Sequence, residues 1–450
     1  LPVIRISLDP GLETLVDEDD EMGRVLRIDP SDETMIADAI DLVDGPIAGL
    51  LHAASLDIGS EPWDATRPDD LTIAAHATFG LLRALDGRLR ANPSIVASLT
   101  ALDGRHGNHG SRFNALQAGA SGVMEAFAHE IADHTCRVRA FDVHPDLLMD
   151  PDSLAHRLWE DVTHLSGEVE VGLDRDGRRW ALVAFAEDLE AESEDPNVHH
   201  WLVSGGGSGV TAASIIALAK AVPDAGHTFT LLGRSKLIPL TATWITWSDA
   251  ELEEERLALR ARLVEASKDG KVTMVQWNAA WKRMTRSRDV HATLAAIEAT
   301  GNRASYEAVD INDHDAMVAL GTSLEPVSGI IHGAGLEDSK RVTDKDWSMF
   351  DAVVRTKVDG WRNLISAAEQ SGGTVLHACA FTSVAGRFGN MGQTDYAAAN
   401  NILDAEMARL TASGQMRAVA IGWTGWKEVG MATRGSLESI FEAGGIDMLP

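Results

Sequence analysis

Cysteine is scarce in this chain, and long apolar runs are absent from it. Only Cys136 and Cys379 are present among 450 residues, which argues against a disulfide framework and favours a reducing, cytoplasmic environment. No hydrophobic run reaches the roughly 20 residues needed to cross a membrane. The chain begins LPVIRISLDP, with neither an initiator methionine nor a signal peptide, so we interpret it as a piece excised from a longer polypeptide.

Positive charge is also rare. The chain holds 39 Lys and Arg against 68 Asp and Glu, for a formal net charge of −29, and its first lysine is Lys220. Such an acidic protein is poorly suited to bind nucleic acid or an anionic membrane, and we expect neither as a partner. The plain interpretation of the charge is solubility.

The apolar runs that are present alternate with helix-like stretches, which predicts an α/β fold with parallel strands. A chain of 450 residues is too long for one ordinary core, so two or three domains are expected. The acidic run AFAEDLEAESEDP (184–196) has no strand period and ends in proline. We place a boundary there and predict two tandem Rossmann-like, doubly wound parallel-sheet subdomains, residues 1–195 and 196–450.

Three phrases of the first half recur in the second half in the same order. They are GPIAGLLHAASLD (45–57) and EPVSGIIHGAGLED (325–338), GRHGNHG (104–110) and GRFGNMG (386–392), and CRVRAFDVH (136–144) and MRAVAIGW (416–423). Collinear matches of this kind indicate duplication of one α/β unit. Only the second copy has a glycine-rich loop after its opening strand, so the first copy is predicted to be degenerate and structural.

The second half opens with WLVSGGGSGVTAAS (201–214), an apolar strand followed by a glycine cluster and a helix of small residues. Glycines let the backbone turn tightly and approach a pyrophosphate, whose charge suits a helix N-terminus. An ordinary strand–helix turn is the alternative. The residues predicted to hold the nucleotide in this loop are Gly205, Gly207, Ser208, Gly209 and Val210.

The next strand ends in Arg234 and Ser235 rather than in a carboxylate. An acidic residue there would bind a ribose 2′-hydroxyl, whereas an arginine can hold a 2′-phosphate with two hydrogen bonds. This favours NADPH over NADH, and a solvated surface arginine is the alternative. Further cofactor contacts are expected from Asp310 and Ile311 near the adenine and from the close passage of Gly333, Ala334 and Gly335.

The stretch FTSVAGRFGNMGQTDYAAANNILDAEMARL (381–410) carries the candidate chemistry. Ser383 ends a predicted strand, Tyr396 lies 13 residues later at the head of a helix, and Asn400 follows at i+4. Tyr396 and Asn400 therefore share one helix face. Taken singly, each residue also has a plain structural role: packing for the tyrosine, a turn for the serine and a polar helix face for the asparagine.

These residues resemble the short-chain dehydrogenase/reductase superfamily, in which a tyrosine donates a proton to a carbonyl while NAD(P)H delivers hydride. The usual Tyr-x-x-x-Lys is here Tyr396-Ala-Ala-Ala-Asn400, a departure shared by the ketoreductase domains of polyketide and fatty-acid synthases. The resemblance implies a lysine from an earlier helix, which makes Lys357 of VVRTKVDGWRNL (353–364) the candidate. The segment 421–432 resembles the family's substrate loop and includes Trp423, Trp426 and Met431, although Gly422 and Gly425 replace the family's Asn and Pro.

The implied chemistry needs these residue types. A tyrosine near its ordinary pKa of about 10 is a poor proton donor to a ketone, and a nearby Lys357 ammonium is expected to bring that pKa toward working pH. By resemblance, Lys357 would also hold the ribose hydroxyls. Ser383 would orient the carbonyl oxygen, and Asn400 would position a water that resupplies the proton.

The resemblance covers nearly the whole chain and fits polyketide-synthase ketoreductases best, with an insertion near 244–300 similar to that of polyunsaturated-fatty-acid-type synthases. It implies NADPH-dependent reduction of a β-ketoacyl thioester on an acyl carrier protein, with neighbouring synthase domains as further partners. Because Phe388 stands where one ketoreductase class has tryptophan, we expect the (3R)-hydroxy product. Two alternatives stay open: an inactive reductase-like scaffold, and a free-standing reductase or epimerase acting on a small soluble substrate.

Within the insertion, Ser248 and Glu251 form a capping box that predicts a charged helix over 248–270. The helix is expected to pack on the surface, and docking to a neighbouring domain is the alternative.

The histidines of GRHGNHG and of VHH (198–200) raise the question of a metal site. Aligned on GRFGNMG, the first phrase places Ala101 opposite Ser383 and Asn114 opposite Tyr396, and the first half offers no lysine. We therefore predict that GRHGNHG is a retired active-site loop, that residues 198–200 belong to a linker, and that the chain binds no metal.

Overall fold

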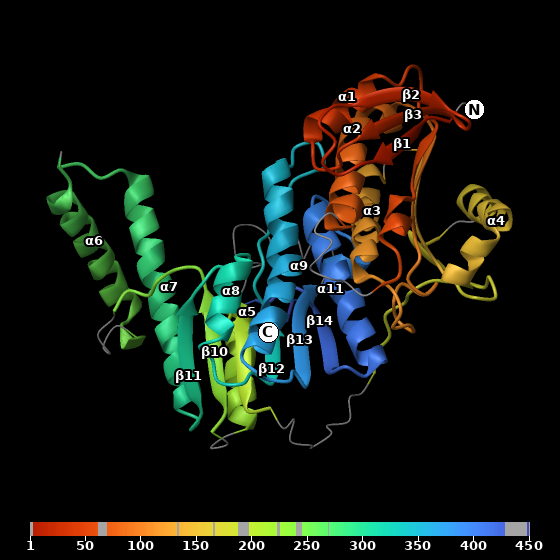
Figure 1. The fold of residues 1–450 in the computed structure, drawn as a ribbon. Coiled ribbons are helices and arrows are strands. Elements are labelled where there is room, and N and C mark those ends of the chain that lie inside the picture. The colour runs from red at the N-terminus through yellow and green to blue at the C-terminus, as the bar shows by residue number, and fades with distance from the viewer. Residues whose placement is uncertain are drawn as a thin grey trace. The chain divides into compact units, whose positions relative to one another are not determined.

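The computed structural model describes residues 3–61, 70–132, 135–164, 167–187, 198–222, 226–239, 245–268, 270–427 and 448–449. Met431 of the expected substrate loop and most of the acidic boundary run lie outside these ranges. The chain (Figure 1) divides into two compact units: unit 1 is Leu1–Glu194, Gly335–Arg362 and Ala378–Trp423, and unit 2 is Asp195–Ala334, Asn363–His377 and Thr424–Pro450. No helix within the described ranges is long and apolar enough to cross a membrane.

Unit 1 contains two complete sheets. In the small one, β3 (Gly23–Ile28) pairs parallel with β1 (Arg5–Leu8) and antiparallel with β2 (Val16–Asp20). The larger sheet has the order β4 (Gly49–His52), β5 (Ser94–Thr100), β6 (Cys136–Val143), β7 (Glu170–Leu173) and β8 (Arg179–Trp180). Its first four strands are parallel and β8 is antiparallel. Six of the seven residues of β5 are buried, as expected for a parallel strand that is covered on both faces.

Two more strands and most of the helices complete unit 1. The strands are β13 (His377–Ser383, from Ala378 onward) and β14 (Arg417–Trp423). The helices are α1 (Glu33–Asp41), a π-helical turn (Thr72–His76) leading into α2 (Ala77–Ala91), α3 (Ala118–Ile131), α4 (Pro151–His164), the first part of α9 (Trp347–Gln370), α10 (Val384–Phe388) and α11 (Thr394–Ser413). Short 3-10 turns lie at Ala54–Ile58, Ala115–Gln117 and Pro145–Met149.

Unit 2 is built on four parallel strands in the order β11 (Arg303–Ala308), β10 (Thr228–Gly233), β9 (His200–Ser204) and β12 (Gly329–His332). Its helices are α5 (Gly209–Ala221), α6 (Asp249–Ala266), α7 (Met274–Glu298), α8 (His314–Gly321) and the last part of α9. The strands β10 and β11, which follow β9 in the sequence, lie on one side of it in the sheet, and the next strand, β12, lies on its other side. A parallel sheet has its ligand crevice at such a switch point, at the carboxyl ends of the strands.

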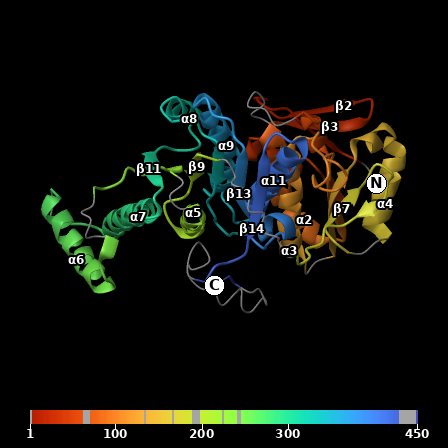
Figure 2. The ribbon, with the colours of Figure 1, turned by 90° about the horizontal axis from the view of Figure 1, so that it is seen from below.

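The predicted insertion is a helical hairpin of α6 and α7 (Figure 2). The capping box predicted at Ser248 and Glu251 is present, and α6 begins directly after it. The helix ends at Ala266, short of the predicted 270, because Ser267 takes extended backbone angles. A second capping box, made by Thr273 and Gln276, starts α7. Two strong start signals explain why this charged segment forms two helices.

The predicted fold class, α/β with Rossmann-like parallel sheets in both halves, is confirmed by the strand pairings. The compact units, however, divide the chain differently from the predicted subdomains, because residues 335–362 and 378–423 of the second half pack with the first half in unit 1. The boundary at 195/196 concerns the duplication of the chain and stays a prediction.

The helices α3 and α11 pack against each other in unit 1 and run side by side in Figure 1. Their contact depends on small residues. A β-carbon added to Gly122 would lie 2.6 Å from the carbonyl oxygen of Ala397, and one added to Gly119 would lie 3.0 Å from Cδ1 of Ile402. Ala398 and Ile402 are fully buried there. Each helix follows one of the two related glycine phrases, so the duplication pairs the corresponding helices.

We predict that Gly122→Ala destabilises the protein by about 1–3 kcal/mol, because the added methyl group meets the backbone of α11 and cannot be accommodated without a shift. The matched control is Gly87→Ala in α2, where no atom lies within 4 Å of the added β-carbon. This control should raise stability by about 0.5–1 kcal/mol, since alanine has a higher helix propensity than glycine. Chemical denaturation of both variants measures the two changes, and equal effects would contradict the packing argument.

Candidate active site

Three elements of unit 1 bring the predicted catalytic residues together. Ser383 is the last residue of β13, and Tyr396 and Asn400 lie one turn apart in the first turns of α11. Asn400 is fully buried, and its Nδ2 donates to the carbonyl oxygen of Tyr396 at 2.7 Å. Its Oδ1 has no hydrogen-bond partner among the described residues. A buried acceptor of this kind is available to a water or a substrate group.

Lys357, on helix α9, lies close to Tyr396. Its side chain is 3 % exposed, and its Nζ donates to the carbonyl oxygen of Phe381 at 2.7 Å. The same nitrogen lies 5.9 Å from the centre of the Tyr396 ring. The lysine predicted from a separate helix therefore lies beside the tyrosine, although 39 residues separate them in the sequence.

Burial dominates the charge state of Lys357. It lowers the pKa of the ammonium to about 8, and the carboxylate of Asp404 acts to raise that pKa again. Burial also raises the pKa of Asp404, to about 6, while Arg387, Thr382 and Lys357 act to lower it. Near neutral pH the pair is therefore an ammonium and a carboxylate, each stabilising the charge of the other.

Tyr396 departs from the expectation that Lys357 would lower its pKa. Burial and the nearby charge of Glu337 raise the pKa of Tyr396 to about 12, while hydrogen bonds with Asn400 and Ser383 act in the opposite direction. The physical reason is that burial destabilises the charged phenolate by more than the hydrogen bonds with Asn400 and Ser383 stabilise it. The phenol consequently keeps its proton at neutral pH.

The glycine loop after β9 in unit 2 has the backbone of a phosphate cradle. Gly205 and Gly209 have φ of 73° and 70°, angles that side chains rarely allow. A β-carbon on Gly205 would lie 2.7 Å from the amide nitrogen of Ala334, and one on Gly333 would collide with Thr211. Ser208 is the N-cap of α5, and its side chain makes no hydrogen bond to the first N–H groups of that helix. An anion fits these donors.

The other predicted cofactor residues end neighbouring strands of unit 2. Ser204 pairs with Leu232 and with His332, which places the ends of β9, β10 and β12 at one edge. Arg234 and Ser235 follow β10 and are exposed, and no ion pair or hydrogen bond of the Arg234 guanidinium occurs among the described residues. Arg234 is therefore available to a phosphate, and exposed Lys236 adds a second cation beside it.

The remaining predicted residues fall into two groups. Asp310 and Ile311 follow β11, whose continuation pairs Val309 with Gly233, so they lie at the same edge as Arg234. In unit 1, a β-carbon on Gly335 would lie 3.3 Å from Cε of Lys357, so this position allows only a small residue. Trp423 packs edge-on against Phe381, with 5.5 Å between the ring centres, in unit 1. Trp426 bridges to Leu449 in unit 2, and Met431 lies outside the described residues.

Sequence reasoning missed two charged residues beside the predicted catalytic residues. Asp404 lies one turn beyond Asn400 on α11, and this i+4 spacing was a usable signal. The second is Lys345, whose side chain is 0 % exposed and whose Nζ pairs with Asp395, next to Tyr396, at 2.8 Å. Nothing in the local sequence distinguishes Lys345 from a surface lysine, because its partner is distant in the chain.

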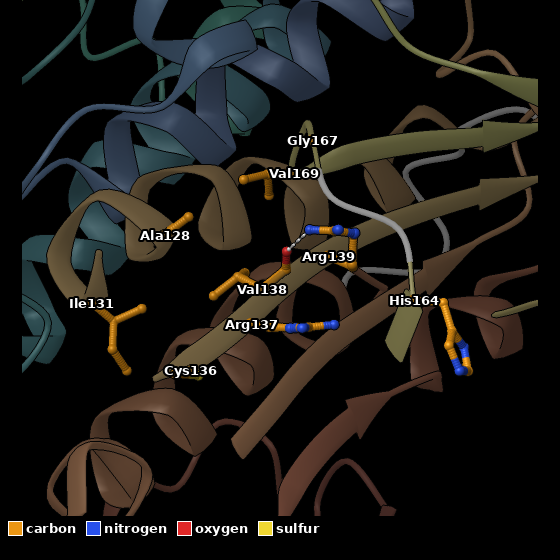
Figure 3. Close-up of a pocket in the computed structure, with 9 residues that line it drawn as sticks. All are labelled: Ala128, Ile131, Cys136, Arg137, Val138, Arg139, His164, Gly167 and Val169. Carbon is orange, nitrogen blue, oxygen red and sulfur yellow. Dashed lines mark hydrogen bonds between the residues drawn. The ribbon is translucent and has the colours of Figure 1, made fainter. Parts of the chain in front are cut away.

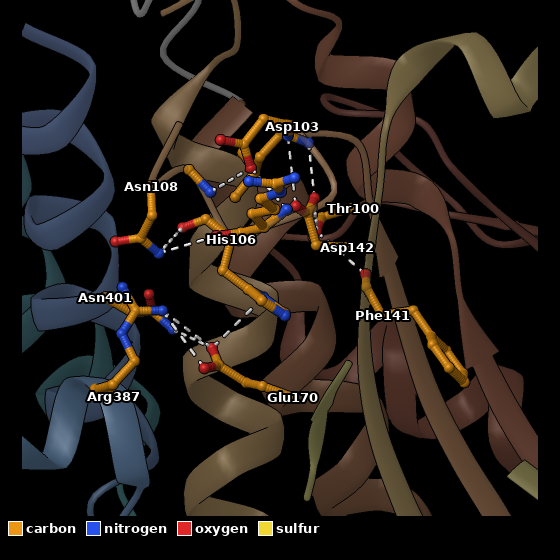
Figure 4. Close-up of polar contacts among 12 residues, drawn as sticks. Thr100, Asp103, His106, Asn108, Phe141, Asp142, Glu170, Arg387 and Asn401 are labelled. Carbon is orange, nitrogen blue, oxygen red and sulfur yellow. Dashed lines mark hydrogen bonds and ion pairs between the residues drawn. The ribbon is translucent and has the colours of Figure 1, made fainter. Parts of the chain in front are cut away.

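The GRHGNHG loop is held by carboxylates of unit 1 (Figure 4). Asp103 accepts the backbone N–H groups of Arg105, Gly107 and His109, and Asp142 accepts those of Leu102 and His106. The His106 ring is 3 % exposed, and its Nδ1 lies 3.7 Å from Glu170. No group of three potential metal ligands occurs in the part of the chain that the structure describes. The loop thus has a structural frame of its own, and its role as a retired active-site loop stays a prediction.

A hollow of about 340 Å³ in unit 1 is unrelated to these residues (Figure 3). It lies beside β6 and the end of α3, and its polar lining includes Arg137, Arg139 and His164. Arg139 pairs with Asp161 at 3.2 Å, and Arg137 donates to the carbonyl oxygen of Val162. No residue predicted to bind substrate or cofactor lines it.

Comparison with known proteins decides the family. The family model for the KR domain matches residues 200–428, just over half of the chain. The chain belongs to the KR domain family. KR domains are ketoreductases of the short-chain dehydrogenase/reductase superfamily, and the resemblance inferred from Ser383, Tyr396 and Lys357 is confirmed at the level of the family.

Relatives of this KR domain are segments of large synthases. It is 28 % identical over 399 residues to one of the subunits of the polyunsaturated fatty acid synthase of Thraustochytrium sp., a match that covers 84 % of this chain and 14 % of that protein. It is 30 % identical over 177 residues to mellein synthase of Phaeosphaeria nodorum, covering 38 % of this chain and 10 % of that protein. The chain therefore spans about a seventh of the length of the Thraustochytrium protein and about a tenth of mellein synthase.

Solved structures share the fold. An A1-type ketoreductase superposes with a TM-score of 0.65 at 22 % identity, covering 92 % of this chain and 76 % of that one. An N-terminal ketoreductase from a macrolactin assembly line gives 0.64 at 16 % identity, covering 96 % and 75 %. The coverage confirms the two-part ketoreductase fold along nearly the whole chain. KR domains use nicotinamide cofactors, and the glycine cradle and the uncapped α5 N-terminus fit the pyrophosphate of such a cofactor.

Proposed function

We propose that this KR domain reduces a β-ketoacyl thioester to the β-hydroxyacyl thioester with NADPH, with Tyr396 as the proton donor. The observation that carries the proposal is the buried arrangement of Ser383, Tyr396, Asn400 and Lys357 at the junction of α9, β13 and α11. The bound nicotinamide would supply the hydride. Everything else that the reaction needs is proton transfer and orientation, which these four residues provide.

Tyr396 is protonated at neutral pH and would donate to a carbonyl oxygen that gains negative charge. Its raised pKa makes it a weaker acid than a free tyrosine, so the proton transfer would depend on groups that stabilise the developing charges. Ser383 would hold the same oxygen by a second hydrogen bond. As Tyr396 loses its proton, the Lys357 ammonium would stabilise the phenolate, and the free Oδ1 of Asn400 would hold the water that restores the proton.

The proposed cofactor preference rests on Arg234. Its exposed, uncommitted guanidinium stands where a carboxylate would select NADH, so it would bind the 2′-phosphate of NADPH. Gly205, Gly209 and the first turn of α5 would hold the pyrophosphate. Asp310 and Ile311 would contact the adenine.

The proposed substrate follows from the relatives. They are a mellein synthase and part of a polyunsaturated fatty acid synthase, and synthases of this kind present acyl groups as thioesters. We propose an acyl carrier protein with a phosphopantetheine-bound substrate as the partner, alongside neighbouring synthase domains. We also propose the (3R)-hydroxy product, because Phe388 stands in place of the tryptophan of the opposite class.

We predict that Tyr396→Phe lowers kcat for reduction of a simple ketone, trans-1-decalone, by about 10²–10⁴-fold, the usual contribution of a general acid. The phenyl ring fills the same volume, so the fold and NADPH affinity should be kept. Steady-state kinetics measures the first effect and fluorescence titration of NADPH the second. Unchanged ketone reduction would contradict the mechanism, and an inactive wild type that still binds NADPH would favour the scaffold alternative.

We predict that Arg234→Ala weakens NADPH binding by about 10–100-fold, the usual loss when hydrogen bonds to a charged group are removed. NADH affinity should change little, because NADH lacks the 2′-phosphate. The control is Arg303→Ala, which removes an exposed arginine that pairs with Glu325 in the same unit. Titration with both cofactors checks the prediction, which fails if the two affinities drop together.

We predict that reduction slows as pH rises through about 8, the lowered pKa of Lys357, because the ammonium is the form that stabilises the Tyr396 phenolate. Asp404→Asn removes the carboxylate that raises this pKa, so the fall in kcat/KM should move to lower pH. The control Asp359→Asn alters a carboxylate on α9 that pairs with Arg355 and should leave the profile in place. The pH dependence of kcat/KM for trans-1-decalone decides. A fall that stays at the wild-type pH in Asp404→Asn would refute the role of Asp404.

A further inference from the structure

The α6–α7 hairpin of unit 2 (Asp249–Glu298) is electrically balanced, with nine Lys and Arg against nine Asp and Glu, and its cations are concentrated in one segment. Residues 256–288 hold nine Lys and Arg against two Asp and Glu, a net charge of +7 in a chain whose net charge is −29. The cationic residues are Arg256, Arg260, Arg262, Lys268, Lys271, Lys282, Arg283, Arg286 and Arg288. This segment is therefore basic, and acidic residues flank it at 249–255 and at Asp289.

Several of these cations are already engaged within the hairpin. Arg256 and Arg260 lie over the ring of Trp277, at 4.8 and 5.2 Å from its centre. Arg262 pairs with Glu255, and Arg288 donates to backbone oxygens of the preceding loop. These contacts stabilise the hairpin itself.

Three cations of α7 have no such role. Lys282, Arg283 and Arg286 are exposed, and the described residues offer them no ion pair and no side-chain hydrogen bond. Spaced at i, i+1 and i+4, they crowd like charges on neighbouring positions, which weakens an isolated helix. They lie in the middle of the helix Met274–Glu298, too far from its C-terminus to be explained by the helix dipole. Helix stability therefore gives no reason for these three residues.

The same side of α7 carries apolar groups. Val275, Ala279, Lys282 and Arg286 follow the 4-3-4 spacing of one helix face and are all exposed, with Val275 78 % exposed and Met274 54 %. Trp277 and Met284 are buried on the other side. We call Met274, Val275, Lys282, Arg283 and Arg286 the basic stripe. A surface that mixes cations with apolar side chains is typical of a protein interface.

We propose that the basic stripe docks an acidic carrier domain, through carboxylates that pair with Lys282, Arg283 and Arg286; this inference rests on the proposed function. An extended polyanion such as DNA, or an anionic membrane, would also come close to acidic parts of this protein and would be repelled by them. A compact acidic domain is small enough to contact the basic stripe itself, and charges beyond about 10 Å are screened at physiological salt. Exposed charge pairs of this kind steer association and contribute modestly to affinity, as a transient delivery step requires.

The test compares one acyl group with and without a carrier. The substrates are acetoacetyl-loaded acyl carrier protein and acetoacetyl-N-acetylcysteamine, and the variant is Lys282→Glu/Arg283→Glu/Arg286→Glu. We expect KM for the carrier-bound substrate to rise about tenfold or more, in a salt-dependent way, with turnover of the free thioester unchanged. The control is Arg175→Glu/Arg178→Glu/Arg303→Glu, which makes the same change in net charge at exposed arginines outside the hairpin.

The outcomes separate the docking proposal from the proposed function. An unchanged KM for carrier in the stripe variant, or an equal rise in the control, overturns docking at the stripe. Tighter binding of duplex DNA or of phosphatidylglycerol vesicles than of the carrier protein overturns the choice of partner. If wild type fails to reduce the free thioester, the proposed function fails, and calorimetric titration of carrier protein against wild type and stripe variant still decides the docking.

Discussion

The close packing of α3 on α11 is the constraint on which the catalytic arrangement depends. The backbone of Ala397 lies so near Gly122 that no β-carbon fits between them, and Ala397 directly follows Tyr396. The helix that carries Tyr396 thus packs directly on a helix of the first half of the chain. The first half therefore forms part of the surface against which α11 is built.

Buried charges tie the same elements together. Lys357 is opposed by Asp404, and Asp404 is influenced in turn by Arg387. Arg387 contacts Glu170 of β7 at 3.3 Å, and His106 of the retired loop lies on the other side of that carboxylate (Figure 4). Burial of one charge without its partner would be costly. Residues of the two related glycine phrases, Arg387 and His106, therefore both lie next to Glu170.

The two kinds of site in this KR domain use different physical means. The glycine cradle of unit 2 relies on backbone N–H groups and on the absence of side chains, because a β-carbon at Gly205 or Gly333 would clash with its neighbours. The predicted catalytic residues of unit 1 are buried, and burial lowers the pKa of Lys357 to about 8 and raises that of Tyr396 to about 12. The basic stripe depends on neither, because it is an exposed surface whose effect is long-range attraction.

The sequence by itself determined the α/β class and the glycine loop, because each of these is a local pattern of spacing or composition. The duplication and the Ser383, Tyr396 and Asn400 set are predictions from local patterns of the same kind. Even the start of α6 was predictable from one capping box. Only the tertiary structure decided that Lys345 and Asp404 are buried partners of the site, that α3 supports α11, and that burial raises the pKa of Tyr396. The physical reason is that these depend on which distant segments exclude water from one another, and no local pattern records that.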